Sequence, residues 1–248
     1  MTGHRSPFTV LFLVLLVLAL PAAAPARVFS RWTAGAHTAR ALAAAGGETL
    51  YRAKVTVNNG RGELTVFGFD EPLARVTGTL ARSFDLPAFA KAEGDLAVAS
   101  CRSGDRVVRL VAARLFAGGR TLLFALEQSE DQARASRAPP AGNRLGAVPA
   151  YPGSEPLFFV KDEKTRAALA VSRTDSGSRE VQAFLAGRLA DAGWTPVFPA
   201  SGPGVADVET PAMKVYLRNE SVCCLLVQPL PGATGSRITL LHKPDAME

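Results

Sequence analysis

The stretch Thr174–Trp194 (TDSGSREVQAFLAGRLADAGW) carries the clearest helix pattern in the chain and constrains the fold more than any other feature. Its first turn has Ser178 as the expected N-cap, because a side-chain oxygen there can accept a free backbone N–H. Gly193 can close the helix in the left-handed conformation, with Trp194 folding back onto the last turn. Its apolar residues recur at steps of three and four and define one buried face: Val181, Phe184, Leu185, Leu189 and Ala192. Since the flanking segments resemble strands, we expect the helix to lie across a sheet.

Residues 1–26 have the pattern of a signal peptide. Arg5 supplies the positive start, Phe8–Leu20 is apolar except for Thr9, and Ala24-Pro25-Ala26 places small residues where a signal peptidase reads. A spanning helix needs about 20 apolar residues, so an uncleaved membrane anchor is the weaker alternative. The sequence therefore predicts cleavage after Ala26 and a periplasmic or secreted protein that has no membrane contact after cleavage.

The charge of the chain excludes one class of partner. The formal net charge is +6, and removing residues 1–26 takes away Arg5 and no acid, which leaves +5. The Lys and Arg residues are scattered along the sequence instead of forming a stripe, so no nucleic-acid partner is expected. A protein partner in the cell envelope remains the favoured expectation.

Residues 27–127 are predicted to form a first α+β half. It starts with an alanine-rich segment that carries Phe29 and Trp32 and ends at Gly46-Gly47. Alternating apolar and polar residues over Thr49–Asn58, a turn at Asn59-Gly60 and a return over 63–69 predict a β-hairpin. A helix from Asp70 to 84 should follow it. Three further strands then form an antiparallel meander: Leu96–Cys101, Arg106–Phe116 and Thr121–Glu127.

Residues 128–152 read as a linker, and 153–248 as a second half of similar order. The linker is rich in Ala, Arg, Pro and Gly and shows no apolar periodicity, which predicts a solvated tether. In the second half a hairpin of 157–161 and 167–172 precedes the opening helix, a short strand is expected at 195–198, and a loop fills 201–210. Three strands complete it: Met213–Arg218, Ser221–Val227 and Arg237–Lys243. The fold class is therefore α+β with two similar halves, each β-β-α followed by a meander, which suggests an internal duplication.

The three cysteines are Cys101, Cys223 and Cys224. Neighbouring residues of a strand point to opposite faces, so the vicinal pair should not form a disulfide. Two alternatives remain open: Cys101 forms a disulfide with Cys223 or Cys224, or all three cysteines are buried free thiols. A reactive thiol is the least favoured interpretation.

Few residues in the mature chain suit catalysis. Its histidines are His37 and His242, and His242 is expected to be an edge or partly buried residue of the last strand. No CxxC, HxxxH, GxSxG, P-loop or GxGxxG pattern occurs, so neither a metal nor a cofactor is predicted. Acids at Asp162, Glu163, Asp207 and Glu209 could support acid–base chemistry, although turn acids are usually solvated.

Two aromatic residues coincide with turns, Tyr151 near Pro152-Gly153 and Trp194 after Gly193. They could form a shared recognition patch, but plugging the open end of the sheet is the favoured interpretation.

We therefore expect an exported, non-enzymatic binding or scaffolding module of the cell envelope or periplasm, with no assigned catalytic, cofactor or metal residues. The alternative is a hydrolase or transferase with a site in a groove between the halves. Its residues would be Asp207, Glu209, His242 and Cys224.

Overall fold

A computed structural model describes most of the chain after residue 41. The described residues are 42, 45–83, 89–91, 96–103, 105–114, 120–142, 144–197, 213–230 and 234–245. They fall into two compact units, one ending at Ala138 and the other starting at Pro139. These units are called the N-terminal unit and the C-terminal unit. Their strands and helices give an α+β fold, as the sequence predicted.

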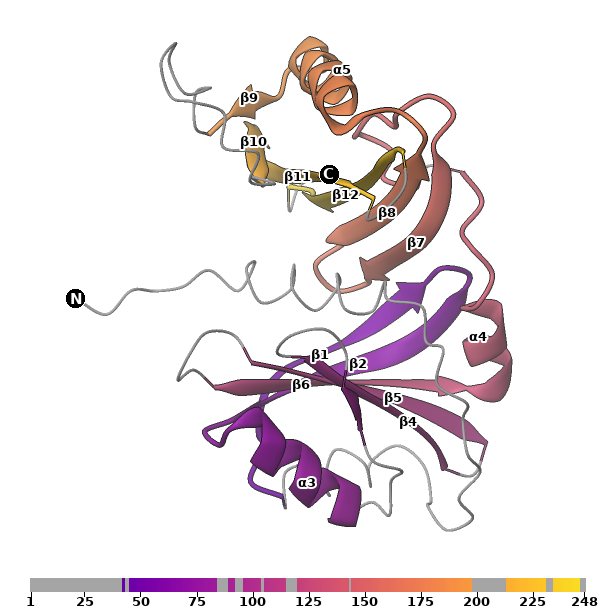
Figure 1. Ribbon diagram of the computed structural model, residues 1–248, viewed down its shortest axis with the longest axis vertical. Helices are drawn as coiled ribbons and strands as arrows, with labels where there is room; N and C mark the ends of the chain where they lie inside the picture. Colours follow the sequence, from indigo (N-terminus) through magenta and orange to yellow (C-terminus); the bar gives the residue numbers. More distant parts are fainter. Residues whose placement is uncertain are drawn as a thin grey trace, which may run out of the picture. The chain divides into compact units, whose positions relative to one another are not determined.

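The N-terminal unit is an antiparallel sheet that carries helices on both faces (Figure 1). The strand order is β3-β4-β5-β6-β2-β1, and α3 (Leu73–Ser83) follows β2 while α4 (Glu130–Ala135) follows β6. The strands are β1 (Glu48–Val57), β2 (Gly60–Phe69), β3 (Ala90–Lys91), β4 (Leu96–Ser103), β5 (Arg106–Arg114) and β6 (Thr121–Ser129).

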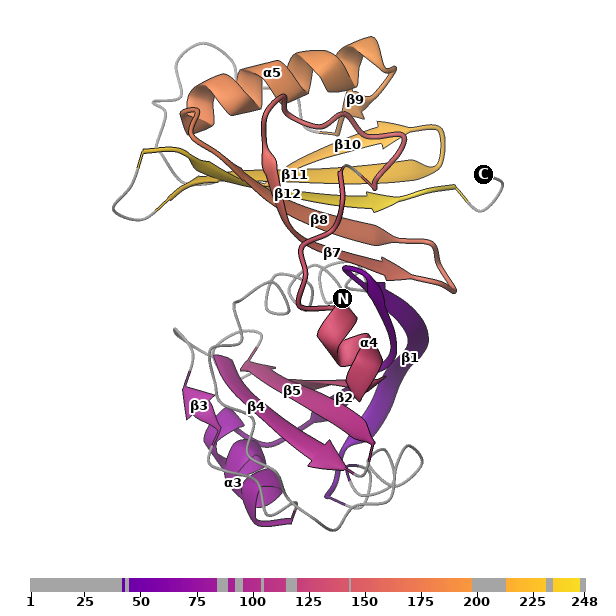
Figure 2. The same ribbon diagram turned by 90° about the vertical axis from the view of Figure 1, so that its right-hand side faces the viewer.

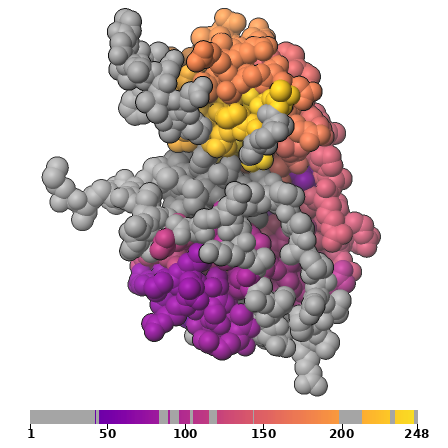
Figure 3. Space-filling view, in the orientation of Figure 1, coloured from indigo at the N-terminus to yellow at the C-terminus, as the bar shows by residue number. Residues whose placement is uncertain are grey.

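Helix α3 packs on one face of this sheet because its apolar residues lie on one side. Val76 and Leu80 are buried against β2, β5 and β6, whereas the outer side of the helix is open to solvent (violet in Figure 3). We call this the α3 face of the sheet. The predicted helix also included Phe84, which lies outside the described residues. The core on this face contains Leu42, Phe67, Phe69, Val76, Leu80, Ala97, Val108, Leu110, Ala112, Leu123 and Ala125.

Helix α4 lies on the opposite face, which we call the α4 face. Its start is capped by Ser129, whose hydroxyl accepts the Gln132 N–H at 3.3 Å. Its end is fixed to the sheet by Gln128, which donates from Nε2 to Ser136 Oγ at 2.7 Å. The backbone approaches so closely at Gly60 that a Cβ there would overlap the carbonyl oxygen of Gln132. Figure 2 shows α4 beside strands β2 and β5.

This helix corrects the prediction of a solvated tether over residues 128–152. Strand β6 continues to Ser129, and Ala133 of α4 is buried. Leu145 and Val148 belong to the core of the C-terminal unit. The sequence pattern missed α4 because a helix of six residues is too short to produce a readable period.

In the C-terminal unit the described residues form strands in the order β7-β8-β12-β11-β10-β9 and the helix α5 (Ser178–Asp191) (Figure 1). Helix α5 covers one face of the sheet through three fully buried residues, Val181, Leu185 and Leu189. The strands are β7 (Glu155–Asp162), β8 (Ala168–Thr174), β9 (Thr195–Pro196), β10 (Lys214–Arg218), β11 (Ser221–Pro229) and β12 (Ser236–Lys243).

The two ends of α5 compare differently with the sequence. At the C-terminus the prediction is confirmed: Gly193 has φ +80° and the Trp194 N–H donates to the Leu189 carbonyl at 2.9 Å. At the N-terminus the prediction is wrong by one residue, because Gly177 is the extended N-cap and Ser178 is already helical. Ala192 is exposed instead of buried.

Candidate functional site

The side chains best suited to chemistry in the C-terminal unit form one row across its sheet. Tyr216 of β10 lies directly opposite Cys223 of β11, and Cys223 lies directly opposite His242 of β12. Residues paired in this way share a face of an antiparallel sheet, and Tyr216 and Cys223 belong to the core under α5. We call these three residues the Tyr–Cys–His row.

Trp194 closes the row from above. Its ring meets the His242 ring edge-on, with centroids 5.6 Å apart, and Arg218 stacks on it with Cζ 4.9 Å from the centroid. Trp194 is 2% exposed and His242 is 6% exposed. The indole Nε1 is buried and has no acceptor among the described residues. The buried indole ring therefore covers the Tyr–Cys–His row and shields it from solvent.

Burial also sets the protonation of the row. Burial, and to a lesser extent the neighbouring Cys224, raises the pKa of the Cys223 thiol from 9.0 to about 12. Burial raises the pKa of Tyr216 as well, with a contribution from Cys223. A nucleophilic cysteine needs a lowered pKa, so a protonated thiol beside a histidine in this core is not activated. The row is a packing feature of the described structure.

This burial predicts a loss of stability at alkaline pH. Because the folded pKa of Cys223 lies above its unfolded value, the stabilisation is complete below pH 9 and is lost as the pH rises toward 12. The free energy of unfolding should fall by about 1.4 kcal/mol per pH unit in that window. Urea unfolding followed by Trp194 fluorescence, in a Trp32→Phe background, measures it.

Cys223→Ala should flatten this alkaline slope, although it also lowers stability at pH 7 by leaving a small cavity. Val227→Ala is the matched control, because it also leaves a small cavity in this core but removes no titratable group, so it should leave the slope unchanged. An identical slope in Cys223→Ala and the wild type would contradict the assignment.

The residues of the alternative enzyme hypothesis, Asp207, Glu209, His242 and Cys224, do not come together within the described residues. His242 is neither an edge nor a partly exposed residue, because β12 lies between β8 and β11. Cys224 is paired with Leu241 and so points to the face opposite that of His242. Asp207 and Glu209 lie outside the described residues. The sequence did not single out Tyr216, although the register of the 213–227 hairpin could have placed it opposite Cys223.

All three cysteines are free thiols. The prediction that Cys223 and Cys224 point to opposite faces is confirmed, since only Cys223 belongs to the core under α5. Cys101 is half-buried in β4, and burial followed by the charge of Glu127 raises its pKa to about 11. A thiol with so high a pKa has little thiolate at neutral pH and is a poor nucleophile.

The two aromatic residues at turns do not form one patch. Tyr151 lies at the start of α5, where its hydroxyl is 2.9 Å from Ser176 Oγ and 2.8 Å from Glu180 Oε1. Its ring meets Phe184 edge-on at 5.1 Å. Trp194 lies at the other end of this helix of 14 residues, about 20 Å away at 1.5 Å per residue. The shared-patch hypothesis is therefore wrong, and both rings contribute to packing.

Asp162 differs from the expectation for an acid in a turn. It is buried, and its Oδ1 accepts the backbone N–H groups of Lys164 at 2.7 Å and Thr165 at 3.2 Å. These bonds hold the turn between β7 and β8, where Arg166 takes a positive φ of 59°. Asp162 therefore shapes the hairpin, while Glu163 is exposed.

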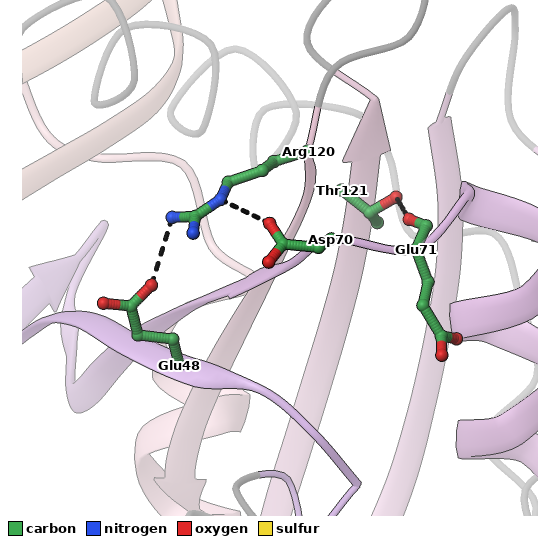
Figure 4. Close-up of polar contacts among 5 residues, drawn as sticks. All are labelled: Glu48, Asp70, Glu71, Arg120 and Thr121. Atoms are coloured by element: carbon green, nitrogen blue, oxygen red, sulfur yellow. Dashed lines mark hydrogen bonds and ion pairs between the residues drawn. The ribbon is translucent and has the colours of Figure 1, made fainter.

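An exposed ion-pair cluster joins three strand ends of the N-terminal unit (Figure 4). Arg120 donates from Nε to Asp70 at 2.7 Å and pairs through Nη1 with Glu48 at 3.1 Å. Beside it the Thr121 hydroxyl donates to the Glu71 carbonyl at 2.7 Å. The side chains of Arg120 and Asp70 are 51% and 79% exposed. Exposed pairs of this kind are screened by water and add little to stability, so we treat the cluster as a surface feature of these strand ends.

Comparisons with known proteins provide no relative from which a function could be transferred. No protein-family model matches the chain, and neither a curated protein nor a solved structure matches it. In the part of the chain that the structure describes, no group of three His, Cys, Asp or Glu residues could hold a metal ion. Among the same residues no helix has the length and apolar character needed to span a membrane.

Proposed function

We propose that the protein is an exported, non-enzymatic binding or scaffolding module of the cell envelope or periplasm that binds a protein partner through the outer edge of β4. The observation that carries this proposal is the pairing of β3. It contacts β4 only at Ala97 and Val98, so residues 99–103 pair with β5 on one side but have no strand partner on the other side among the described residues. The backbone groups along such an edge can pair with an extended segment of another protein.

Two further observations agree with a binding role. The Tyr–Cys–His row is sealed beneath Trp194 and carries a protonated thiol, so its chemical groups are not available to a substrate. The signal-like residues 1–26 favour export, where a partner of the envelope would be met.

The edge is tested by photo-crosslinking in the native envelope fraction. A photoreactive amino acid at Ser100 should capture a partner, whereas the same group at Arg179, on the exposed side of α5, should not. A proline at the open edge should block the partner, because proline has no N–H to donate. Neighbouring residues direct their N–H groups alternately toward β5 and outward, so Ala99→Pro and Ser100→Pro are both made. The proline variant that keeps the native melting temperature has the outward N–H and should abolish capture. Capture that survives this proline, or equal capture from Arg179, would contradict the edge.

Export is tested separately. A chain tagged at its C-terminus should be recovered from the periplasmic or envelope fraction with Arg27 as its first residue. Ala26→Tyr should block cleavage, because the peptidase reads a small residue there. A cytoplasmic protein that retains residue 1 would overturn this part of the proposal.

We also propose that the two units are copies of one ancestral module. The N-terminal unit runs β1-β2-α3-β3-β4-β5-β6, and the C-terminal unit runs β7-β8-α5-β9-β10-β11-β12. Numbered within each unit, both strand orders read 1-2-6-5-4-3. The two units thus share both the sequence of elements along the chain and the order of strands within the sheet. This double agreement supports duplication.

A duplication predicts that the segment between the copies is cut first by a protease. Arg137 and Arg144 are exposed and flank the boundary at Ala138. Limited trypsin digestion should cleave at one of these arginines before it cuts within either sheet, since paired strands resist local unfolding. Mass spectrometry of the first fragments identifies the site. Early cleavage at Arg109 or Arg173, inside β5 or β8, would contradict the boundary.

A further inference from the structure

The α4 face of the N-terminal unit carries a group of arginines that no sequence motif indicated. Arg102 of β4 lies opposite Val107, and Arg109 of β5 lies opposite Ser100 and Leu126. Both arginines alternate with residues of the α3 core, so both point to the other face. Their Cβ atoms are diagonal neighbours across β4 and β5, about 7–8 Å apart in an antiparallel pair.

A third arginine, two residues beyond the end of α4, lies near Arg109. Arg137 follows Ser136, whose hydroxyl is held at 2.7 Å by Gln128 of β6. Gln128 lies opposite Val107 and is therefore the diagonal neighbour of Arg109. Burial lowers the pKa of Arg109, and the charge of the nearby Arg137 lowers it further.

The positive charge of this group is not balanced by protein acids. Arg102 pairs through Nη1 with Glu130 at 3.2 Å, yet its Nε is buried and has no acceptor among the described residues. Within the same residues the guanidinium groups of Arg109 and Arg137 have no ion pair and no side-chain hydrogen bond. The three arginines and Glu130 together leave a net charge of +2. Keeping a half-buried cation without a counterion is unfavourable.

From this juxtaposition of Arg109, Arg137 and the orphan Nε of Arg102 on the α4 face, we propose a binding site for a phosphate group. A phosphate carries about −1.5 to −2 at pH 7, which matches the excess charge. Its oxygens fit the fork of guanidinium donors in a bidentate way, which an ammonium group cannot reproduce. The site is independent of the β4 edge, because its donors belong to side chains of one sheet face and not to the strand backbone.

The test uses the full chain and inorganic phosphate at constant ionic strength. Arginine Nε–H signals in a ¹⁵N-labelled sample should shift in a saturable way, with Arg109 and Arg137 affected most. Arg109→Gln and Arg137→Gln should each weaken phosphate binding about tenfold, the loss expected for one charge-assisted interaction. Arg137→Lys should recover only part of the affinity, because the bidentate geometry is lost.

Arg134→Gln is the matched control. It removes the same charge three residues earlier in the chain, but Arg134 already pairs with Asp131 at 3.2 Å, so phosphate binding should change less than about twofold. Equal weakening in Arg134→Gln and Arg137→Gln would mean a diffuse charge effect and would overturn the site. Unsaturable shifts would overturn it as well.

Two further arms identify the ligand and guard against misfolding. O-phosphoserine binding at least as tightly as inorganic phosphate would indicate that the site takes phosphate esters, and exclusion of the ester would restrict the site to the free ion. Acetate binding as tightly as phosphate would overturn the preference for a dianion. Arg137 is exposed, so Arg137→Gln should fold normally and decides the outcome even if Arg109→Gln does not fold.

Discussion

Trp194→Ala should lower the free energy of unfolding of the C-terminal unit by about 4 kcal/mol, the middle of the range for removing a large aromatic ring from a core. The ring is 2% exposed, covers His242 and lies under the guanidinium of Arg218. Its removal opens a cavity above the Tyr–Cys–His row. It also removes the packing of the indole ring at the C-terminal end of α5. Calorimetry or urea unfolding followed by circular dichroism measures the loss.

Trp194→Phe is the informative control for this prediction. The indole Nε1 has no acceptor among the described residues, so phenylalanine forfeits ring volume but no hydrogen bond. We expect it to recover more than half of the stability lost in Trp194→Ala. If Trp194→Ala melts like the wild type, the ring does not support the core, and its burial has no energetic consequence.

Gly60→Ala should destabilise the N-terminal unit by roughly 3 kcal/mol, near the upper end of the usual cost of forcing extra volume into a packed site. The new Cβ would overlap the Gln132 carbonyl and the Ser136 hydroxyl, so α4 would have to move away from β2. That movement would disturb the bond from Arg61 N–H to Gln132 Oε1 at 2.6 Å and the bond from Asn58 Nδ2 to the Ser136 carbonyl at 2.7 Å. Denaturant unfolding provides the measurement.

Gly78→Ala is the matched substitution in the same unit. A Cβ at Gly78 meets nothing within 4 Å, and the residue is in the middle of α3. It should stabilise the helix by about 0.5–1 kcal/mol, because alanine loses less backbone freedom than glycine on folding. Opposite signs for the two glycine substitutions would show that contact with α4, and not glycine content, decides the result; a stabilising Gly60→Ala would place α4 elsewhere.

Local periodicity was enough to locate most elements of the protein. The alternation of Ala53, Val55 and Val57 predicted both β1 and its buried side, and these three residues are buried. The spacing of Val181, Leu185 and Leu189 predicted α5 and the face that it buries. Both patterns are readable because side-chain direction repeats every two residues in a strand and every 3.6 in a helix.

The sequence pattern did not predict the short helix α4 or the burial of the Asp162 side chain. Helix α4 is shorter than the window in which a helical period can be recognised. Asp162 looked like a solvated acid, because the sequence does not show which backbone N–H groups a folded turn will direct at it. Its carboxylate is buried only once β7 and β8 pair.

The sequence by itself determined the approximate position of most strands and of α3 and α5, which side of α5 and β1 is apolar, and that Cys223 and Cys224 point apart. Only the tertiary structure decided which non-consecutive strands are neighbours, β2 with β6 and β8 with β12. That pairing placed β12 in the centre of its sheet and put His242 opposite Cys223 under Trp194. It also brought Arg102 and Arg109 to the face where Arg137 follows α4. The physical reason is that residue propensity and periodicity act over a few neighbouring positions, whereas strand order depends on contacts between segments far apart in the chain.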